Sequence, residues 1–296
     1  MKKLSISIIA KNETNSIAKC LDSLKELQDN GCEVVVCDTG SEDNTVEIAK
    51  RYTDKVYTDY LWCDDFAGAR NHANSKCSGD WIFTIDCDCM LATSFEQIKK
   101  EIELAEKDGN QSVQVQCLEI GTPANHWLPL IYKNDPKIFW AGKVHNHINA
   151  NAGRQGEIKI NYWYSDSHSK DPDRSFRILK KVVDEKPDCV REKFYLAREY
   201  WYRNDYITAI HWYKKYLTVS VYGPEMADGY LTLARCYWHI MEGDQARACC
   251  LQAIALNTNF KEALLFMAEM SGPGNKKRWL EFAETATNIS VLFIRT

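Results

Sequence analysis

The hydrophobic residues in the first half of the chain follow two alternating patterns. Short apolar runs are separated by longer stretches in which apolar residues recur every three or four positions. The runs lie at 4–10, 32–38 and 80–86, and the stretches lie at 15–29, 44–52, 66–76 and 94–107. The runs predict strands covered on both faces, and the stretches predict amphipathic helices. Strands that alternate with helices predict an α/β domain on a Rossmann-like sheet, with less regular strands after residue 111.

The pattern becomes helical from about residue 171 and stays helical to residue 296. Asp171 is a suitable N-cap residue, and Pro172 suits the first turn of a helix. We therefore expect two domains, an α/β domain over 1–170 and an all-α domain over 171–296.

Small and aromatic residues recur within the helical half at the spacing of tetratricopeptide helix pairs. Three frames share the spacing: Leu196, Ala197, Tyr200, Ala209 and Tyr213; Leu233, Ala234, Tyr237, Ala246 and Ala253; and Met267 with Ala268. Stacked helices need small residues where they touch, which is why alanine recurs in such frames. The frames predict a tetratricopeptide-like domain, with an unrelated helical bundle as the alternative.

Composition narrows the possible environments of the chain. The net charge of −4 over 296 residues gives no general attraction to nucleic acid or anionic membranes, although a local basic groove for nucleic acid stays open. The twelve cysteines are dispersed without a CxxC pair, which is typical of reduced thiols in a cytoplasmic protein. No apolar run reaches the roughly 18 residues of a membrane span, and the first apolar run is too short for a signal peptide.

Aromatic residues are dense at one place in the helical half. They are Tyr195, Tyr200, Trp201, Tyr202, Tyr206, Trp212, Tyr213 and Tyr216. One helix pair cannot bury all of them, so some should face a partner surface. We expect a homodimer formed through this half.

Acidic and amide residues follow three of the predicted strands. Asp86 and Asp88 follow the third run, Asp38 ends the second, and Asn12 with Glu13 follows the first. In an open parallel sheet the carboxyl ends of the strands form one ligand-binding crevice. Carboxylates two residues apart at such an edge can share Mg²⁺ or Mn²⁺, with open positions left for phosphate oxygens. For Asp38, a purely structural role in a turn or helix cap is the alternative.

Four ordered motifs carry a family resemblance. They read IIAKNE (8–13), VVVCDTGSEDNT (34–45), DDFAGARNHA (64–73) and GDWIFTIDCDC (79–89). Over residues 4–168 the chain resembles inverting family 2 glycosyltransferases, which have the GT-A nucleotide-sugar-binding fold. The segment LIYKNDPKIFWAGKVHNHI (130–148) is similar to the acceptor side of lipopolysaccharide-core and sublancin-type peptide glycosyltransferases, several of which carry tetratricopeptide-like helices.

The resemblance implies a UDP-sugar donor and a role for each motif residue. Asp38 would read the base, Asn12 and Glu13 would line the same pocket, and Arg70 would lie near the diphosphate. A guanidinium suits phosphate oxygens because its donors form a fixed fork. A surface salt bridge is the alternative role for Arg70.

The resemblance also implies a metal site for Mn²⁺ or Mg²⁺. Asp86 and Asp88 would bracket the metal and the donor ribose, with Asp88 as the more direct ligand. A late histidine often completes such sites, so His168 is the expected third ligand, with His145 as the other candidate.

Two positions depart from the family pattern. Cys89 stands where relatives commonly have an acid, and Asn146 follows His145 where relatives often have glutamate. An amide does not accept a proton at neutral pH, so Asn146 cannot replace a glutamate base. The base therefore stays open among His145, His147 and Asp135, or the acceptor needs little deprotonation.

The combined expectation is an inverting, metal-assisted transfer of a hexose or N-acetylhexosamine from UDP to an unidentified acceptor. A peptide, a glycan or lipid, and a modified nucleobase are all open as acceptors. An inactive GT-A and tetratricopeptide adaptor is the alternative that Asn146 and Cys89 suggest. A nucleotidyltransferase is disfavoured because the loop after the first strand, KNETNS, lacks the glycine-rich basic pattern of those enzymes.

Overall fold

A computed structural model describes residues 3–122, 125–151, 153–163 and 170–286. The chain divides into two compact units, Met1–Asp173 and Arg174–Thr296. All twelve cysteines are free thiols. Within the described ranges, no helix combines the length and the apolar character that crossing a bilayer requires.

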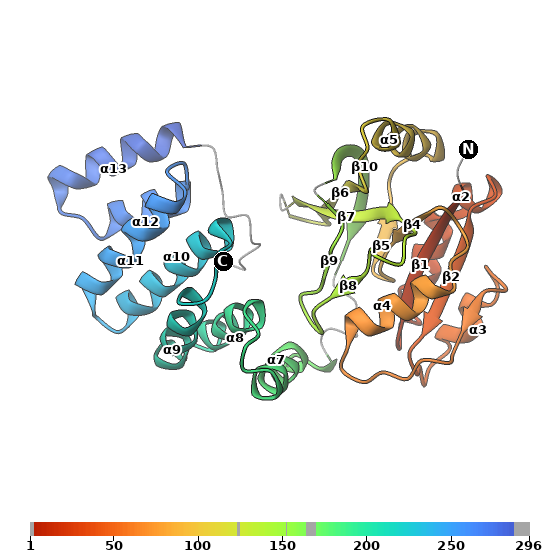
Figure 1. Ribbon diagram of the computed structural model, residues 1–296, viewed down its shortest axis with the longest axis horizontal. Helices are drawn as coiled ribbons and strands as arrows, with labels where there is room; N and C mark the ends of the chain where they lie inside the picture. Colours follow the sequence, from red (N-terminus) through yellow and green to blue (C-terminus); the bar gives the residue numbers. More distant parts are fainter. Residues whose placement is uncertain (1–2, 123–124, 152, 164–169, 287–296) are drawn as a thin grey trace. The chain divides into compact units, whose positions relative to one another are not determined.

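The first unit is an α/β domain built on one large mixed sheet (Figure 1). Its strands are β1 (Leu4–Ala10), β2 (Glu33–Asp38), β3 (Val56–Tyr57), β4 (Trp81–Thr84), β5 (Cys89–Leu91), β6 (Ser112–Glu119), β7 (Asn125–Lys133), β8 (Trp140–Ala141), β9 (His147–Ile148) and β10 (Arg154–Tyr162). Its helices include α1 (Ile17–Ser23), α2 (Lys25–Asp29), α3 (Thr45–Ala49), α4 (Phe66–Ser75) and α5 (Phe95–Lys107). This is the GT-A architecture that the sequence predicts.

The order of the strands reverses within the sheet, beside β1. Eight strands lie in the order β3-β2-β1-β4-β7-β6-β10-β5, and β8 pairs separately with β9. β1 pairs in parallel with both β2 and β4, whereas β7 runs antiparallel to β4. The chain moves outward from β1 through β2 to β3 and then returns to the other side of β1 as β4. The point where the strand order reverses, beside β1, is where open α/β sheets bind ligands.

Buried apolar residues on both faces explain why these runs form central strands. Ile6, Val34 and Phe83 lie on one face of the sheet and Val35 and Ile82 on the other, and each is at most 2% exposed. Helix α4 packs on β1 and β2, and helix α5 packs on β6 and β10. β-branched and aromatic side chains fit such a doubly covered sheet, so local preference and burial agree.

Three expected boundaries are wrong. The helix expected over 15–29 is two helices, because Leu24 has a ψ of 0° and interrupts the helical ladder between α1 and α2. The third strand ends at Thr84 rather than residue 86, since a turn closes there with the amide of Cys89 donating to the Asp86 carbonyl at 3.0 Å. Asp171 does not cap the first helix of the second unit, because that helix begins three residues later at Arg174.

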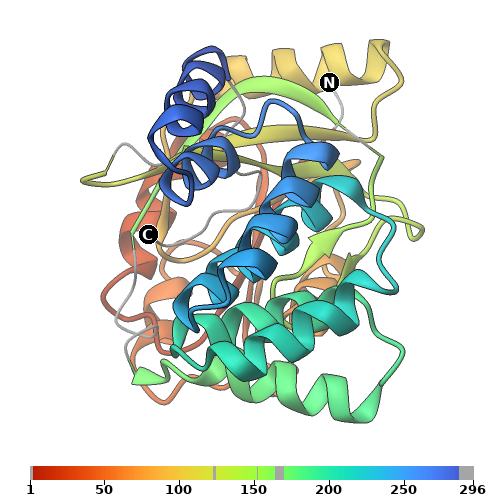
Figure 2. The same cartoon turned by 90° about the vertical axis from the view of Figure 1, so that its left-hand side faces the viewer.

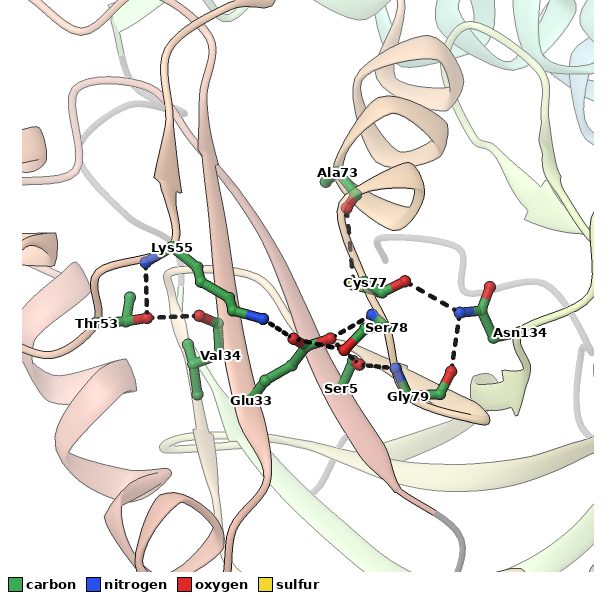
Figure 3. A network of polar contacts seen from close by, with 10 residues as sticks. All are labelled: Ser5, Glu33, Val34, Thr53, Lys55, Ala73, Cys77, Ser78, Gly79 and Asn134. Carbon is green, nitrogen blue, oxygen red and sulfur yellow. Dashed lines mark hydrogen bonds and ion pairs between the residues drawn. The ribbon is translucent and has the colours of Figure 1, made fainter.

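One carboxylate joins the amino ends of the parallel strands (Figure 3). Glu33, at the start of β2, accepts hydrogen bonds from the Ser5 hydroxyl of β1 at 2.5 Å and from the Ser78 hydroxyl at 3.1 Å. It also accepts from the Ser78 amide and pairs with Lys55, which precedes β3. Gly79 is required beside this network, because a Cβ there would lie 2.6 Å from the Ser5 hydroxyl oxygen. The network therefore ties β1, β2, β3 and the start of β4 together.

The same contacts set the protonation of Glu33. Burial by itself raises the pKa of this carboxyl, but hydrogen bonds from Lys55, Ser5 and Ser78 outweigh burial and lower the pKa to about 2. The Glu33 side chain is 14% exposed, whereas Lys55 is 44% exposed, so solvent screens part of the ion pair.

The second unit is all-α (Figure 2). Its described helices are α7 (Arg174–Glu185), α8 (Arg191–Tyr202), α9 (Tyr206–Leu217), α10 (Gly223–His239), α11 (Gly243–Leu256), α12 (Lys261–Glu269) and α13 (Pro273–Thr285). Consecutive helices pack side by side, and Ala234, Ala246 and Ala253 belong to one buried cluster together with residues of α12. Ala197, Ala209, Ala234, Ala246, Ala253 and Ala268 are each at most 1% exposed. The tetratricopeptide-like architecture is confirmed.

The aromatic cluster of this unit divides between core and surface. Tyr195, Tyr213 and Tyr216 are buried. The other five members, Tyr200, Trp201, Tyr202, Tyr206 and Trp212, are partly exposed. Arg198 lies 5.6 Å from the ring centre of Tyr195 and 5.7 Å from that of Tyr202, so a cation also covers these rings.

Glu33→Gln should destabilise the first unit by about 1–3 kcal/mol near pH 7, because it removes a charged acceptor from a partly buried network. The folded-state pKa of Glu33 lies below its ordinary value of 4.5, so its stabilising contribution is present above pH 4.5 and is lost as pH falls toward about 2. In urea titrations from pH 7 down to about 3, the free energies of unfolding of the variant and the unmodified protein should converge. Glu47→Gln, at an exposed position of α3, is the control. A difference independent of pH would contradict the role assigned to Glu33.

Ala234→Leu should destabilise the second unit by about 1–3 kcal/mol, because Ala234 is fully buried and the added carbons have no space between helices. Ala255→Leu, on the exposed side of α11, should change the free energy of unfolding little. Denaturant unfolding of both variants provides the measurement. Equal stability of the two would show that Ala234 does not lie at a tight helix contact.

Candidate functional site

Three of the expected site segments meet at the carboxyl edge of β2, β1 and β4. Asp38 is the last residue of β2 and pairs with Ala10, the last residue of β1. Asn12 lies two residues beyond Ala10, and Asp86 lies two residues beyond the end of β4. Parallel pairing therefore brings residues far apart in the sequence to one edge.

The carboxylate of Asp38 shapes the turn after β2. It is 2% exposed, and its Oδ1 accepts from the amides of Gly40 at 3.0 Å and Ser41 at 2.9 Å. Its Oδ2 accepts from the Ser41 hydroxyl. Gly40 has a φ of 102°, a conformation that favours glycine. A carboxylate oxygen has two lone pairs, so Oδ2 retains capacity for one further hydrogen bond.

Asn12 and Glu13 fasten the loop after β1 to the loop after β2. The Asn12 amide donates to the Ser41 hydroxyl at 2.8 Å, and the Asn12 side-chain oxygen accepts from the Glu42 amide at 2.8 Å. The Glu13 amide donates to the Thr45 hydroxyl at 2.7 Å. Asn12 adopts a φ of 57°, which asparagine tolerates better than most residues. These contacts hold both loops in fixed positions around the crevice.

Arg70 of α4 forms an ion pair with Asp86. Its Nη2 lies 2.8 Å from Asp86 Oδ1 and 3.0 Å from Oδ2. The Arg70 side chain is 11% exposed and the Asp86 side chain is 46% exposed, so solvent reaches the carboxylate more than the guanidinium. Arg70 Nε is buried and has no hydrogen-bond partner among the described residues. A surface salt bridge was the alternative role expected for Arg70. Asp86 is exposed as in a surface salt bridge, but the Arg70 side chain is mostly buried.

Trp140 and its neighbours hold Arg70 in place. The Arg70 guanidinium lies 5.0 Å from the centre of the Trp140 ring. Asn71 accepts from the Trp140 amide at 2.8 Å and donates to the Trp140 carbonyl at 2.9 Å, which fixes β8 to α4. Trp140 Nε1 donates to the buried Tyr132 hydroxyl at 2.8 Å, and burial raises the pKa of Tyr132. The sequence analysis did not identify Trp140 as a site residue, although it lies in the segment that carries the acceptor-side resemblance.

The turn from Asp86 to Asp88 rests on neutral thiols. The Cys20 thiol contacts the Asp86 carbonyl at 3.5 Å, and Cys87 and Cys89 are buried in the same region. Burial, reinforced by the nearby aspartates, raises the pKa of each thiol, so all three stay protonated at neutral pH. The Trp163 amide donates to the Asp88 carbonyl at 3.0 Å and links the turn to the end of β10.

Asp86 and Asp88 are the residues of this turn whose chemistry would suit a divalent cation. Both side chains are partly exposed, and hard cations prefer carboxylate oxygens. Among the residues that the structure describes, no group of three or more histidine, cysteine or acidic residues converges on a metal position. His168 lies outside the described residues.

The segment after β7 forms a hairpin attached to α4. β8 and β9 pair through Trp140 with Ile148 and Ala141 with His147, and the Lys143 carbonyl accepts from the Phe66 amide at 2.9 Å. His145 and His147 do not lie in one extended segment, because His145 has a φ of 48° in the turn before β9.

The hairpin places the three candidate residues of the HNH sequence differently. The side chains of His145 and His147 are exposed and that of Asn146 is partly exposed. Asp135 follows Lys133, which pairs with Trp81 at the amino end of β4. Asp135 is therefore at the opposite end of β4 from Asp86, and the geometry does not favour it as a base.

Comparisons with known proteins agree with the family resemblance. Residues 5–163 match the model of Glycosyl transferase family 2. The chain is 34% identical over 108 residues to a TPR repeat-containing protein of Synechococcus elongatus, covering 36% of this chain and 26% of that protein. It is 39% identical over 111 residues to an uncharacterized glycosyltransferase of Rickettsia typhi, covering 38% of this chain and 35% of that protein. The matches thus span about a quarter to a third of these relatives' lengths.

Among solved structures, S. aureus TarS 1-349 in complex with UDP-GlcNAc has a TM-score of 0.47 and 14% identity. That similarity covers 87% of this chain and 90% of the TarS chain. The family match covers more than half of the 296 residues and includes every described site segment. The chain therefore belongs to glycosyl transferase family 2.

Proposed function

We propose that this protein is an inverting glycosyltransferase that moves a hexose or N-acetylhexosamine from a UDP-sugar to an acceptor. The observation that carries the proposal is the Arg70 and Asp86 ion pair at the edge where the ends of β1, β2 and β4 meet. The Arg70 guanidinium suits the negative charge of a diphosphate. The carboxylates of Asp86 and Asp88 suit a metal ion bound to that diphosphate.

Each side of the crevice has a separate task in this proposal. The turn of Asp38 and the loop of Asn12 and Glu13 bind the nucleoside. Arg70 pairs with Asp86 through Nη2, which is close enough to the proposed metal-binding turn for the guanidinium to contact the diphosphate. Asp86 and Asp88 would hold Mg²⁺ or Mn²⁺, which neutralises charge on the departing diphosphate when bound.

The reaction is a single displacement at the anomeric carbon. An acceptor heteroatom forms the new bond, the bond from carbon to the UDP oxygen breaks, and UDP leaves with the bonding electron pair. Negative charge grows on UDP as that bond breaks, so the fixed Arg70 guanidinium stabilises the transition state more than the ground state. A base must accept the acceptor's proton if the acceptor is a hydroxyl.

His147 is the stronger candidate for that base. It lies in β9, whose partner strand β8 is fixed beside Arg70 through Asn71 and Trp140. His145 lies in the left-handed turn and has a structural role in making that turn. Asn146, between them, cannot accept the proton at neutral pH.

Asp88→Asn should abolish divalent-dependent UDP binding while preserving the fold, because it removes charge from a partly exposed turn. Calorimetry with UDP, in the presence and absence of Mn²⁺, measures the effect. Asp29→Asn, at the exposed end of α2, is the matched control and should bind as the unmodified protein does. Unchanged Mn²⁺-dependent affinity in Asp88→Asn would exclude the metal role. UDP binding without sugar transfer or donor hydrolysis would favour a non-catalytic binding protein.

His147→Ala should lower the rate of transfer at saturating donor by about 10²-fold or more, and His145→Ala should have a smaller effect. A neutral imidazole is the basic form, so transfer by the unmodified protein should fall as pH drops below about 6.5. Rates measured between pH 5.5 and 8 with an acceptor found by mass-spectrometric screening provide the test. A flat profile with both alanine variants active would exclude both imidazoles as the base.

A further inference from the structure

The segment between β3 and α4, residues 58–65, runs along the donor side of the crevice and is here called the donor strap. β3 pairs with β2 through Tyr57 and Cys37, one residue before Asp38. The chain therefore leaves the sheet beside the Asp38 turn. It then reaches α4, where the Asp65 side chain accepts from the Gly68 amide at 2.8 Å and caps the helix that carries Arg70.

The donor strap lies directly against the turn after Asp38. The Trp62 amide donates to the Thr39 carbonyl at 3.0 Å. A Cβ atom on Gly40 would lie 3.8 Å from Cδ2 of Leu61, which is van der Waals distance. Leu61 is nevertheless 76% exposed, so its side chain contacts the turn at one end and presents the rest of its apolar surface to solvent.

Contacts on both sides of Leu61 hold the donor strap in this position. Asp59 lies 2.8 Å from Nε2 of His72 on α4 and 2.7 Å from Nζ of Lys76, the C-cap residue of that helix. Beyond Leu61, the Trp62 ring packs edge-on against Phe66 at 4.6 Å between ring centres. Leu61 is therefore exposed although the segment that carries it is held in place.

The Asp38 carboxylate is largely occupied by the turn itself. Asp38 accepts three hydrogen bonds within the turn, and the Ser41 hydroxyl both donates to Asp38 and accepts from Asn12. Asp38 therefore has capacity for one further hydrogen bond to a base, at Oδ2. Apolar contact with the flat face of a base would supply further affinity, since removing both surfaces from water is favourable.

We propose that Leu61 is a nucleobase contact, covering one face of the donor's uracil while the base edge meets the Asp38 turn. This inference rests on the proposed function, because it requires that a uridine nucleotide occupies the crevice. It assigns the donor strap to recognition of the base and leaves the diphosphate to the Arg70 side of the site.

The test compares a ligand that has a base with one that lacks it. Calorimetry with Mn²⁺ should give a UDP dissociation constant about five- to tenfold higher for Leu61→Ala than for the unmodified protein, the effect expected for losing one apolar contact. The dissociation constant for Mn²⁺-pyrophosphate should stay within about twofold. Leu256→Ala, an exposed leucine of α11, should change neither value. Equal melting temperatures of the two variants would show that the fold is intact.

Three results would overturn the inference. Unchanged UDP affinity in Leu61→Ala would show that the side chain does not touch the base. Equal weakening of UDP and pyrophosphate would show that the substitution acts on the diphosphate side through the donor strap. If the unmodified protein binds Mn²⁺-pyrophosphate but no UDP, or binds neither, the proposed function fails and this inference fails with it.

Discussion

Parallel pairing of β1 with both β2 and β4 is the constraint on which the rest of the site depends. The register aligns Ala10 with Asp38 and Ser7 with Thr84, so the chain emerges from three strands at one edge. Helix α4 packs on β1 and β2, which brings Arg70 to the same edge as Asp86. A shift of register in any of these strands would separate the ion pair from the Asp38 turn.

Glu33 and Asp86, at opposite ends of the parallel strands, use their carboxylates in opposite ways. At the amino edge, Glu33 is 14% exposed, satisfied by several donors and held ionised by them, which suits a permanent structural tie. At the carboxyl edge, the Asp86 side chain is 46% exposed and pairs with one guanidinium. A carboxylate with exposed oxygens can exchange partners when a cation or diphosphate arrives, whereas breaking the Glu33 network would cost stability.

The hairpin of β8 and β9 connects the proposed base to the proposed donor site. Trp140 packs on Arg70, and the Lys143 carbonyl accepts from the first residue of α4, so the hairpin and the helix are held as one piece. The donor strap ends at Asp65, the residue before Phe66. The donor strap and the hairpin are thus both anchored at the start of α4. This shared anchor gives the proposed base and the proposed nucleobase contact fixed positions relative to Arg70.

The sequence by itself determined which elements form, because burial on both faces leaves a continuous apolar run in a strand and helix contacts require alanine at regular spacing. The run at 4–10 is β1 as expected, and the recurring alanines are buried. The sequence also predicted that Asp86 and Asp88 follow a strand, and it contained the four motifs that carry the family resemblance. Tertiary structure alone decided which groups meet. The Arg70 pair with Asp86, the occupied carboxylate of Asp38 and the exposure of Leu61 depend on strand order and turn geometry, which periodicity does not encode.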